Sequence, residues 1–341
     1  MEEEIKFLNR QLELVLLPTE KCNNRCLYCN QHFEKGRMGP EVIDGIKNLV
    51  NARAPEIENL TIQWFGGEPP LAYDIVIDIM RHVSILKELN NFSLSSTMTT
   101  NARLLSPNRL ETLVNLGVAE YQVSFDGNKE EHDKLRLSAD GGGTFDKIWE
   151  NLLGAHRSNL EFGMILRMHI NANNEDSMSL LLDKIAAEIG NDKRFSVFIR
   201  FLERFGGPND AKLPISEDLE TLARLTEKAR LLGLSLYGID LYKEGNEPIC
   251  YAAKPFAFVV RSDGTLNKCT VSLYSDHNHI GRINRDGTME INQQKARLWS
   301  RGFFSGKSEE LSCPIKNFPV EECTPILRKG NDGMTRLRVV Q

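Results

Sequence analysis

The chain has 341 residues, of which 41% are hydrophobic and 26% are charged, and its formal net charge at pH 7 is −5. These values are ordinary for a soluble globular protein with room for a large α/β domain and a smaller one, and the acidic balance argues against a nucleic-acid binder with a basic face. No apolar run is long enough to span a bilayer, and residues 1–4 are acidic and lack the features of a signal peptide, so we expect a cytoplasmic protein that binds neither nucleic acid nor membrane.

Strand-like and helix-like segments alternate from about residue 12 to residue 240. The expected strands are rich in β-branched and aromatic residues, as strands of a covered parallel sheet are. They are 12–17, 60–65, 92–98, 121–125, 163–170 and 195–201. The expected helices are 40–52, 73–89, 107–116, 145–158, 177–189 and 216–232. Pro40, Pro107 and Ser216 stand where we expect helices to begin.

Repeated strand–helix units predict right-handed crossovers and a parallel sheet. Six units are too few for a closed eight-stranded barrel, so we expect an α/β fold in which residues 1–240 form a partial (β/α)6 TIM-like barrel. After residue 240 the pattern changes to two β-hairpins and a short helix. The hairpins are 256–260 with 266–273 and 281–283 with 289–291, and the helix is 294–303. We expect residues 241–341 to form a small α+β domain, and because its hydrophobic core is small, we expect a bound metal to stabilise it.

The cysteines fall into two groups, three near the start and four in the last hundred residues. They are Cys22, Cys26, Cys29, Cys250, Cys269, Cys313 and Cys323. An odd number without a secretion signal is a poor disulfide framework. The distribution therefore predicts two metal sites, one at each end of the chain.

Cys22, Cys26 and Cys29 follow directly on the first expected strand, and loops after strands lie on the catalytic face of a βα barrel. Cubane iron–sulfur clusters normally take four cysteines, so three leave one iron open to chelate the amino and carboxylate groups of an amino acid. The alternative is zinc with His32 as a fourth ligand, although Cys-x3-Cys-x2-Cys does not match the usual paired zinc spacings.

Further motifs follow the next expected strands in order. They are Gly66-Gly67-Glu68-Pro69, Thr99-Thr100-Asn101, Ser124-Phe125-Asp126-Gly127 and, on the fifth strand, Arg167. With the three cysteines, and with Tyr28 before the last of them, these motifs resemble the signature of the radical S-adenosylmethionine (SAM) superfamily. The resemblance covers residues 1 to about 240.

The resemblance implies that Cys22, Cys26 and Cys29 hold a [4Fe-4S] cluster that binds SAM. It further implies cofactor-binding roles for one set of residues. These are Tyr28, Gly66, Gly67, Glu68, Thr100, Asn101, Ser124 and Arg167. Within this set, Glu68 would accept the SAM ammonium group, and Ser124 and Arg167 would contact SAM from the other strands. Taken singly, the same residues also fit a tight turn, helix caps, a solvated strand face or packing beside the cluster.

The implied mechanism is radical generation by electron transfer. The cluster passes one electron to SAM, whose carbon–sulfur bond breaks to give methionine and a 5′-deoxyadenosyl radical, and this radical abstracts hydrogen from an unactivated carbon.

The C-terminal cysteines resemble those of the SPASM and twitch class of this superfamily, which carries auxiliary iron–sulfur clusters. Cys250 and Cys269 flank the first hairpin, and Gly264 lies five positions before Cys269. The full SPASM pattern has seven cysteines and two clusters, so four imply one auxiliary [4Fe-4S] cluster. The twitch form usually closes with Cys-x2-Cys, and Cys313-x9-Cys323 departs from this, so Cys323 is either a fourth ligand or free. A structural zinc site and a set of buried thiols stay open as alternatives.

The class mostly modifies ribosomally made peptides or proteins. In its sulfatase-maturing branch an aspartate base follows the cysteine of Gly-x4-Cys, whereas Thr270 follows Cys269 here. An epimerase needs a free thiol as hydrogen donor, a catalytic role open to Cys313 or Cys323 only if the auxiliary cluster spares one of them. We therefore predict peptide cross-linking through a carbon–carbon or thioether bond. Peptide epimerisation, dehydrogenation of a small alcohol or sugar, and an iron–sulfur sensor without catalysis are the alternatives.

The expected partners are a precursor peptide and a reductant such as flavodoxin or ferredoxin. A separate leader-recognition protein is one way in which the peptide would be recognised. Only about ten residues precede the first strand, so we expect no fused leader-binding domain. Strand addition at a sheet edge is the other way to bind the peptide. Charged residues after the sixth strand are candidates for the substrate mouth, and two aspartates are candidates for polar roles. They are Arg200, Glu203, Arg204, Asp126 and Asp240.

Overall fold

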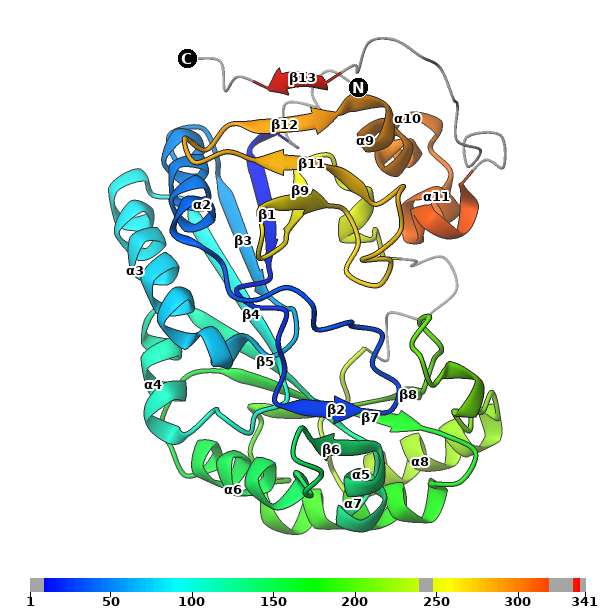
Figure 1. Ribbon diagram of the computed structural model, residues 1–341. Helices are drawn as coiled ribbons and strands as arrows, with labels where there is room; N and C mark the ends of the chain where they lie inside the picture. Colours follow the sequence, from blue (N-terminus) through cyan, green and yellow to red (C-terminus); the bar gives the residue numbers. More distant parts are fainter. Residues whose placement is uncertain (1–8, 239–247, 319–333, 338–341) are drawn as a thin grey trace.

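The computed structural model describes residues 9–238, 248–318 and 334–337 (Figure 1). One sheet organises these residues, with the strand order β13-β12-β11-β10-β9-β1-β3-β4-β5-β7-β8. The six strands predicted from the sequence are all present and pair in parallel. They are β1 (Gln11–Leu16), β3 (Asn59–Trp64), β4 (Ser93–Thr100), β5 (Val118–Phe125), β7 (Gly163–Ile170) and β8 (Phe195–Phe201). The predicted α/β fold with a parallel sheet is confirmed.

Helices lie along the outer face of this sheet (Figure 1). They are α2 (Pro40–Arg53), α3 (Tyr73–Asn90), α4 (Pro107–Asn115), α6 (Phe145–His156), α7 (Glu175–Glu188) and α8 (Leu219–Leu231). Pro40 and Pro107 occupy the first turns of their helices, where the missing N–H is not needed. The start predicted at Ser216 is wrong by three residues, because Asp218 caps α8 by accepting a hydrogen bond from the backbone N–H of Glu220. No helix in the described ranges has the length and apolar character needed to cross a membrane.

The C-terminal part continues the same sheet. Strand β9 (Ala257–Val260) pairs in parallel with β1, which the sequence analysis did not predict. The two predicted hairpins are confirmed as β9 with β10 and β11 with β12, all antiparallel. The remaining elements are β10 (Thr265–Asn267), β11 (His279–Ile283), β12 (Met289–Asn292), β13 (Met334–Leu337), α9 (Gln293–Ser300), α10 (Gly302–Ser305) and α11 (Ser308–Ser312). The predicted division at residue 240 falls within 239–247, outside the described residues, and stays a prediction.

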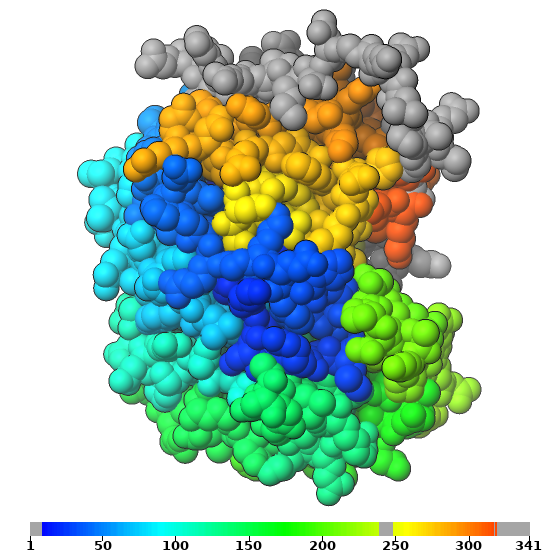
Figure 2. All heavy atoms as spheres, in the orientation of Figure 1, coloured from blue at the N-terminus to red at the C-terminus, as the bar shows by residue number. Residues whose placement is uncertain are grey.

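One hydrophobic core joins the two parts. It includes the fully buried Trp64 from β3 and Trp299 from α9, together with Phe258 and Val260 from β9. Figure 2 shows a blue N-terminal segment between the yellow and orange C-terminal part and the green part of the chain. The cysteine loop is therefore held between both parts of the chain.

A second, two-stranded sheet supports the cysteine loop. Strand β2 (Asn24–Cys26) pairs antiparallel with β6 (Arg136–Ser138), which follows the short helix α5 (Lys129–Leu135). The sequence analysis did not predict this sheet, because three-residue strands are too short to show a period-two pattern.

A buried ion pair fixes the start of the cysteine loop to the end of β9. The Glu20 carboxylate accepts hydrogen bonds from Arg261 Nε at 3.1 Å and Ser262 Oγ at 3.2 Å, and Arg261 Nη2 donates to its other oxygen. The side chains of Glu20 and Arg261 are only 1% and 8% exposed. Burial of both charges requires that each keeps its partner.

We predict that Arg261→Met lowers the free energy of unfolding by about 3–5 kcal/mol, because it leaves the Glu20 carboxylate buried without its cation. Arg285→Met is the matched control, since its ion pair with Asp44 is exposed (69% and 39%). The control should lose less than about 1 kcal/mol. Urea unfolding followed by circular dichroism measures both, and equal losses would contradict a structural role for the buried pair.

Candidate functional site

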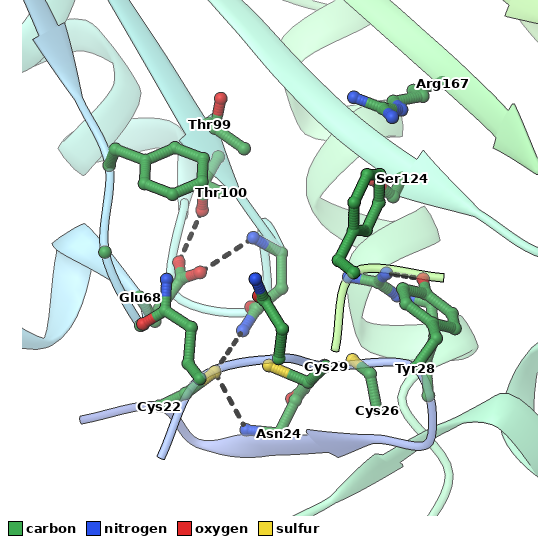
Figure 3. A pocket seen from close by; sticks show the side chains of 18 of the residues that line it. Cys22, Asn24, Cys26, Tyr28, Cys29, Glu68, Thr99, Thr100, Ser124 and Arg167 are labelled. Carbon is green, nitrogen blue, oxygen red and sulfur yellow. Dashed lines mark hydrogen bonds between the residues drawn. The ribbon is translucent and has the colours of Figure 1, made fainter. Parts of the chain in front are cut away.

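A cavity of about 290 Å³ lies at the carboxyl ends of the parallel strands. The eleven N-terminal residues predicted for metal or cofactor binding all line it (Figure 3). They are Cys22, Cys26, Tyr28, Cys29, Gly66, Gly67, Glu68, Thr100, Asn101, Ser124 and Arg167. Loops and strand ends that are far apart in the sequence thus meet at one place, as parallel strands require.

The three cysteines face this cavity from one loop, and their sulfur atoms lie on the same side of it (Figure 3). The backbone N–H of Asn24 donates to Cys22 Sγ at 3.3 Å. Burial raises the pKa of the Cys22 thiol to about 12 and that of Cys26 to about 11. Thiols with such pKa values become thiolates at neutral pH only when a cationic centre binds to them.

The loop fits an iron–sulfur cluster better than zinc. In the described part of the chain, no three Cys, His, Asp or Glu side chains converge on the position of a single ion. A cubane cluster needs no such convergence, because each cysteine binds its own iron. His32, the fourth ligand in the zinc alternative, stacks on Tyr274 with ring centroids 3.8 Å apart.

Glu68 presents a buried carboxylate behind Cys22. It is 1% exposed and accepts hydrogen bonds from the backbone N–H of Asn101 at 2.7 Å and from Thr100 Oγ1. Burial raises the pKa of this carboxyl to about 7, although the bonds from Asn101 and Thr100 act in the opposite direction. A carboxylate held in this way is suited to accept an ammonium group.

Gly66 and Gly67 bring the backbone of their turn against the cysteine loop. Gly66 has a φ of +117°, and a Cβ atom at either position would collide with the carbonyl oxygen of Thr19 or Lys21. The backbone N–H of Gly67 donates to Thr19 O at 3.2 Å, and that of Glu68 to Lys21 O at 3.0 Å. The glycines therefore set the distance between Glu68 and the cysteines.

Asn101 also connects Glu68 with the cysteine loop. Its side chain donates to Asn23 Oδ1 at 2.7 Å and approaches Cys22 Sγ at 3.8 Å, while its backbone holds Glu68. Thr100 and Asn101 thus hold the Glu68 carboxylate by hydrogen bonds, and Asn101 also holds the cysteine loop.

Ser124 and Arg167 lie across the cavity from Glu68 (Figure 3). They are direct neighbours on β5 and β7. A carboxylate on one wall and a guanidinium with a hydroxyl on the opposite wall complement the two charges of an amino acid zwitterion.

A buried polar cluster stands beside Cys26, and the sequence analysis missed two of its members. Tyr28 Oη donates to Asp126 Oδ2 at 2.9 Å, and His169 Nδ1 lies 2.9 Å from Asp126 Oδ1. Arg136 Nη1 donates to Tyr28 Oη. His169 and Arg136 also line the cavity. His169 was foreseeable, because it stands two residues after Arg167 on the same strand face.

Of the residues proposed for the substrate mouth, Glu203 lines the cavity and Arg204 does not. Glu203 also pairs with Arg200. Arg204 instead donates to the backbone oxygen of Asp210 at 2.9 Å. Asp240 lies outside the described residues.

Cys250, Cys269 and Cys313 lie near one another. Burial raises the pKa of the Cys250 thiol, and the nearby Cys269 and Cys313 act in the same direction. The side chain of Asn278 accepts hydrogen bonds from the backbone N–H groups of Lys268 and Cys269, both at 2.8 Å. Cys323 lies outside the described residues.

The loop after Cys269 reaches the cavity, where Thr270 and Val271 form part of the wall. Cys313 is not among the residues that line the cavity. A role for Cys313 or Cys323 as a hydrogen donor stays a prediction.

The chain is similar to known proteins both in sequence and in fold. The model of the radical SAM superfamily matches residues 16–185. A cysteine-type anaerobic sulfatase-maturating enzyme of Clostridium novyi is 28% identical over 316 residues, in an alignment that covers 83% of this chain and 79% of that protein. A PqqA peptide cyclase of Bradyrhizobium diazoefficiens is 26% identical over 234 residues, in an alignment that covers 64% of this chain and only 54% of that protein. The structure of anSMEcpe with bound AdoMet and Cp18Cys peptide has the same fold, with a TM-score of 0.60 and 18% identity over 84% of this chain and 80% of that one.

We predict that Glu68→Gln raises the Kd for SAM at least about tenfold, because it removes a charged acceptor for the ammonium group. In the wild type the ionised carboxylate is the binding form, so the Kd should also rise as the pH falls below about 7. Glu68→Gln should lose this pH dependence. Equilibrium binding of SAM to cluster-containing protein, without reductant, measures both effects.

Glu203→Gln is the control, since Glu203 lines the same cavity but its side chain is 45% exposed. Equal effects of the two substitutions on SAM binding would refute the specific role of Glu68.

Proposed function

Because this chain belongs to the radical SAM superfamily, we propose that it is a peptide-modifying radical SAM enzyme that cross-links a ribosomally made precursor peptide. The observation that carries this proposal is the composition of one cavity. The cysteine loop, Glu68 and Arg167 line it together with Thr270 and Val271 from the C-terminal part. The groups that would bind the cofactors and the residues that would face the substrate therefore line the same cavity.

When bound, the [4Fe-4S] cluster and SAM supply a 5′-deoxyadenosyl radical that abstracts a hydrogen atom from the substrate. Cys22, Cys26 and Cys29 would hold the cluster. Glu68 would accept the ammonium group of SAM, and Ser124 and Arg167 would orient its carboxylate.

Four apolar side chains also line the cavity. They are Phe65, Leu202, Phe205 and Val271. They would exclude water from the reacting atoms and pack against the substrate.

Two kinds of relative support a peptide as the substrate. One is a sulfatase-maturating enzyme and the other a PqqA peptide cyclase. Thr270 favours the second activity over the first. Its hydroxyl lies 2.9 Å from Tyr251 Oη and its backbone N–H donates to the same oxygen at 2.8 Å, so the position that follows Cys269 offers no carboxylate base.

We further propose that residues 241–341 act as a distinct SPASM/twitch-type domain with an auxiliary [4Fe-4S] cluster. Cys250, Cys269 and Cys313 would be ligands, with Cys323 as the fourth. An oxidative cross-link needs an electron acceptor, and a cluster at this place would supply one. A flavodoxin or ferredoxin would reduce the N-terminal cluster, and a separate protein would recognise the leader of the peptide.

Anaerobic reconstitution with iron and sulfide tests the cofactors. The wild type should bind about eight irons per chain and release 5′-deoxyadenosine when SAM and dithionite are added. The Cys22→Ala, Cys26→Ala, Cys29→Ala variant should keep about four irons and release none. The Cys250→Ala, Cys269→Ala variant should also keep about four irons but still cleave SAM. A wild-type protein that binds about eight irons but does not cleave SAM would refute the proposed function.

Mass spectrometry of candidate precursor peptides tests the reaction class. A cross-linked peptide loses two hydrogen atoms, whereas an epimerised peptide keeps its mass. Incubation in deuterated water separates the second case, because epimerisation takes up solvent deuterium at the altered carbon. Deuterium uptake without loss of hydrogen would replace cross-linking by epimerisation.

A further inference from the structure

The two-stranded β2–β6 sheet places a basic residue beside the cluster loop. Cys26 and Arg136 are direct partners in this antiparallel pair. Directly opposed residues in an antiparallel pair project their side chains on the same face. A hydrogen bond from the backbone N–H of Leu27 to Leu135 O, at 2.9 Å, fixes the register next to this pair.

The Arg136 side chain is almost fully buried, with 9% of its surface exposed. Nη1 donates to Tyr28 Oη, and the guanidinium lies 3.9 Å from Asp126 Oδ2. Nε is buried and has no hydrogen-bond partner among the residues that the structure describes. A buried N–H without an acceptor is unfavourable. We therefore infer that a group which binds in the cavity supplies the acceptor.

Asp126 carries the negative charge that balances Arg136, and its carboxylate is hydrogen-bonded to Tyr28 and His169. The residue is fully buried, and the distances to Tyr28 Oη and His169 Nδ1 are both 2.9 Å. Asn174 Nδ2 fixes the backbone of the same residue by donating to Asp126 O at 3.0 Å. Both charges are therefore rigidly placed, and Arg136 is the one paired with Cys26.

The strand pairing puts the buried Arg136 charge next to the residue that would hold the cluster. A fixed cation beside a thiolate ligand favours negative charge on that ligand and on the metal group that it binds.

We propose that Arg136 is a positioning residue that raises the reduction potential of the cluster held by Cys26, through its buried charge and its Nε–H donor. This inference rests on the proposed function and adds a determinant of its redox step. One electron passes from an external low-potential donor, such as flavodoxin or dithionite, to the cluster, and Arg136 keeps its proton throughout. A fixed cation in a buried site stabilises the state with the extra negative charge. Asp126 has the opposite effect.

The test is the midpoint potential of the N-terminal cluster, measured by a redox titration followed by electron paramagnetic resonance without SAM. It is done in full-length protein carrying Cys250→Ala and Cys269→Ala, so that only this cluster reports. Arg136→Met should lower the ratio of reduced to oxidised cluster at a fixed potential about tenfold, which is a shift of 59 mV for a one-electron couple. Asp126→Asn should raise the potential.

Two further variants separate charge from structure. Arg136→Lys keeps the charge and should retain most of the wild-type potential. Lys134→Met removes a positive charge two residues away from Arg136 on a side chain that is 65% exposed, and should leave the potential unchanged.

Opposite shifts for Arg136→Met and Asp126→Asn at unchanged iron content support the proposal. No shift, or shifts in the same direction, overturn it. If Arg136→Met does not bind iron, Asp126→Asn decides alone, since only a field effect predicts a higher potential for it. Failure of the proposed function would be recognised separately, as a wild-type protein that binds and reduces its cluster but does not cleave SAM.

Discussion

The site depends on the close approach of two backbone segments, the turn at Gly66 and Gly67 and the loop that begins at Thr19. Neither glycine tolerates a Cβ atom, because the carbonyl oxygens of Thr19 and Lys21 occupy that space. Backbone hydrogen bonds then lock the two segments together. This contact decides how far the Glu68 carboxylate stands from the cysteines.

The cavity concentrates charged groups that are expensive to bury. Glu68 contributes a carboxylate, Arg136 a guanidinium, and the loop three thiols, of which two have strongly raised pKa values. Such groups remain in a protein interior only when partners hold them, as Thr100 and Asn101 hold Glu68. The arrangement is therefore prepared for ligands that bring charge of both signs, and an amino acid cofactor with a metal cluster does so.

Much of this architecture could be predicted from the sequence, because the strands have long apolar runs and the motifs stand directly at their ends. Pro40 and Pro107 marked two helix starts, because the first turn of a helix does not need the N–H that proline lacks. The parallel pairing of β9 with β1 could not be predicted, since a hairpin pattern says nothing about the strand that lies beside it. Arg136 escaped notice because residues 129–138 are mostly charged and form only a short helix and a three-residue strand. Its importance comes from the register with Cys26, which is a tertiary fact.

The C-terminal part is a wall of the cavity, and this has a consequence for the chemistry. Strand β9 continues the barrel sheet, and the Glu20–Arg261 pair joins its end to the cysteine loop. Thr270, which lines the cavity, is bonded directly to Cys269, so a metal group on Cys269 would sit one residue behind the substrate wall. Because Thr270 itself has no acidic proton to exchange at neutral pH, a proton lost from a substrate must go to another group in the cavity. Among the lining residues outside the predicted cluster and SAM contacts, Glu203 and His169 carry groups that could take one, and Asp126 orients His169 Nδ1. If the proposed reaction releases such a proton, the distance of the altered substrate atom from Glu203 and from His169 would decide which of the two accepts it.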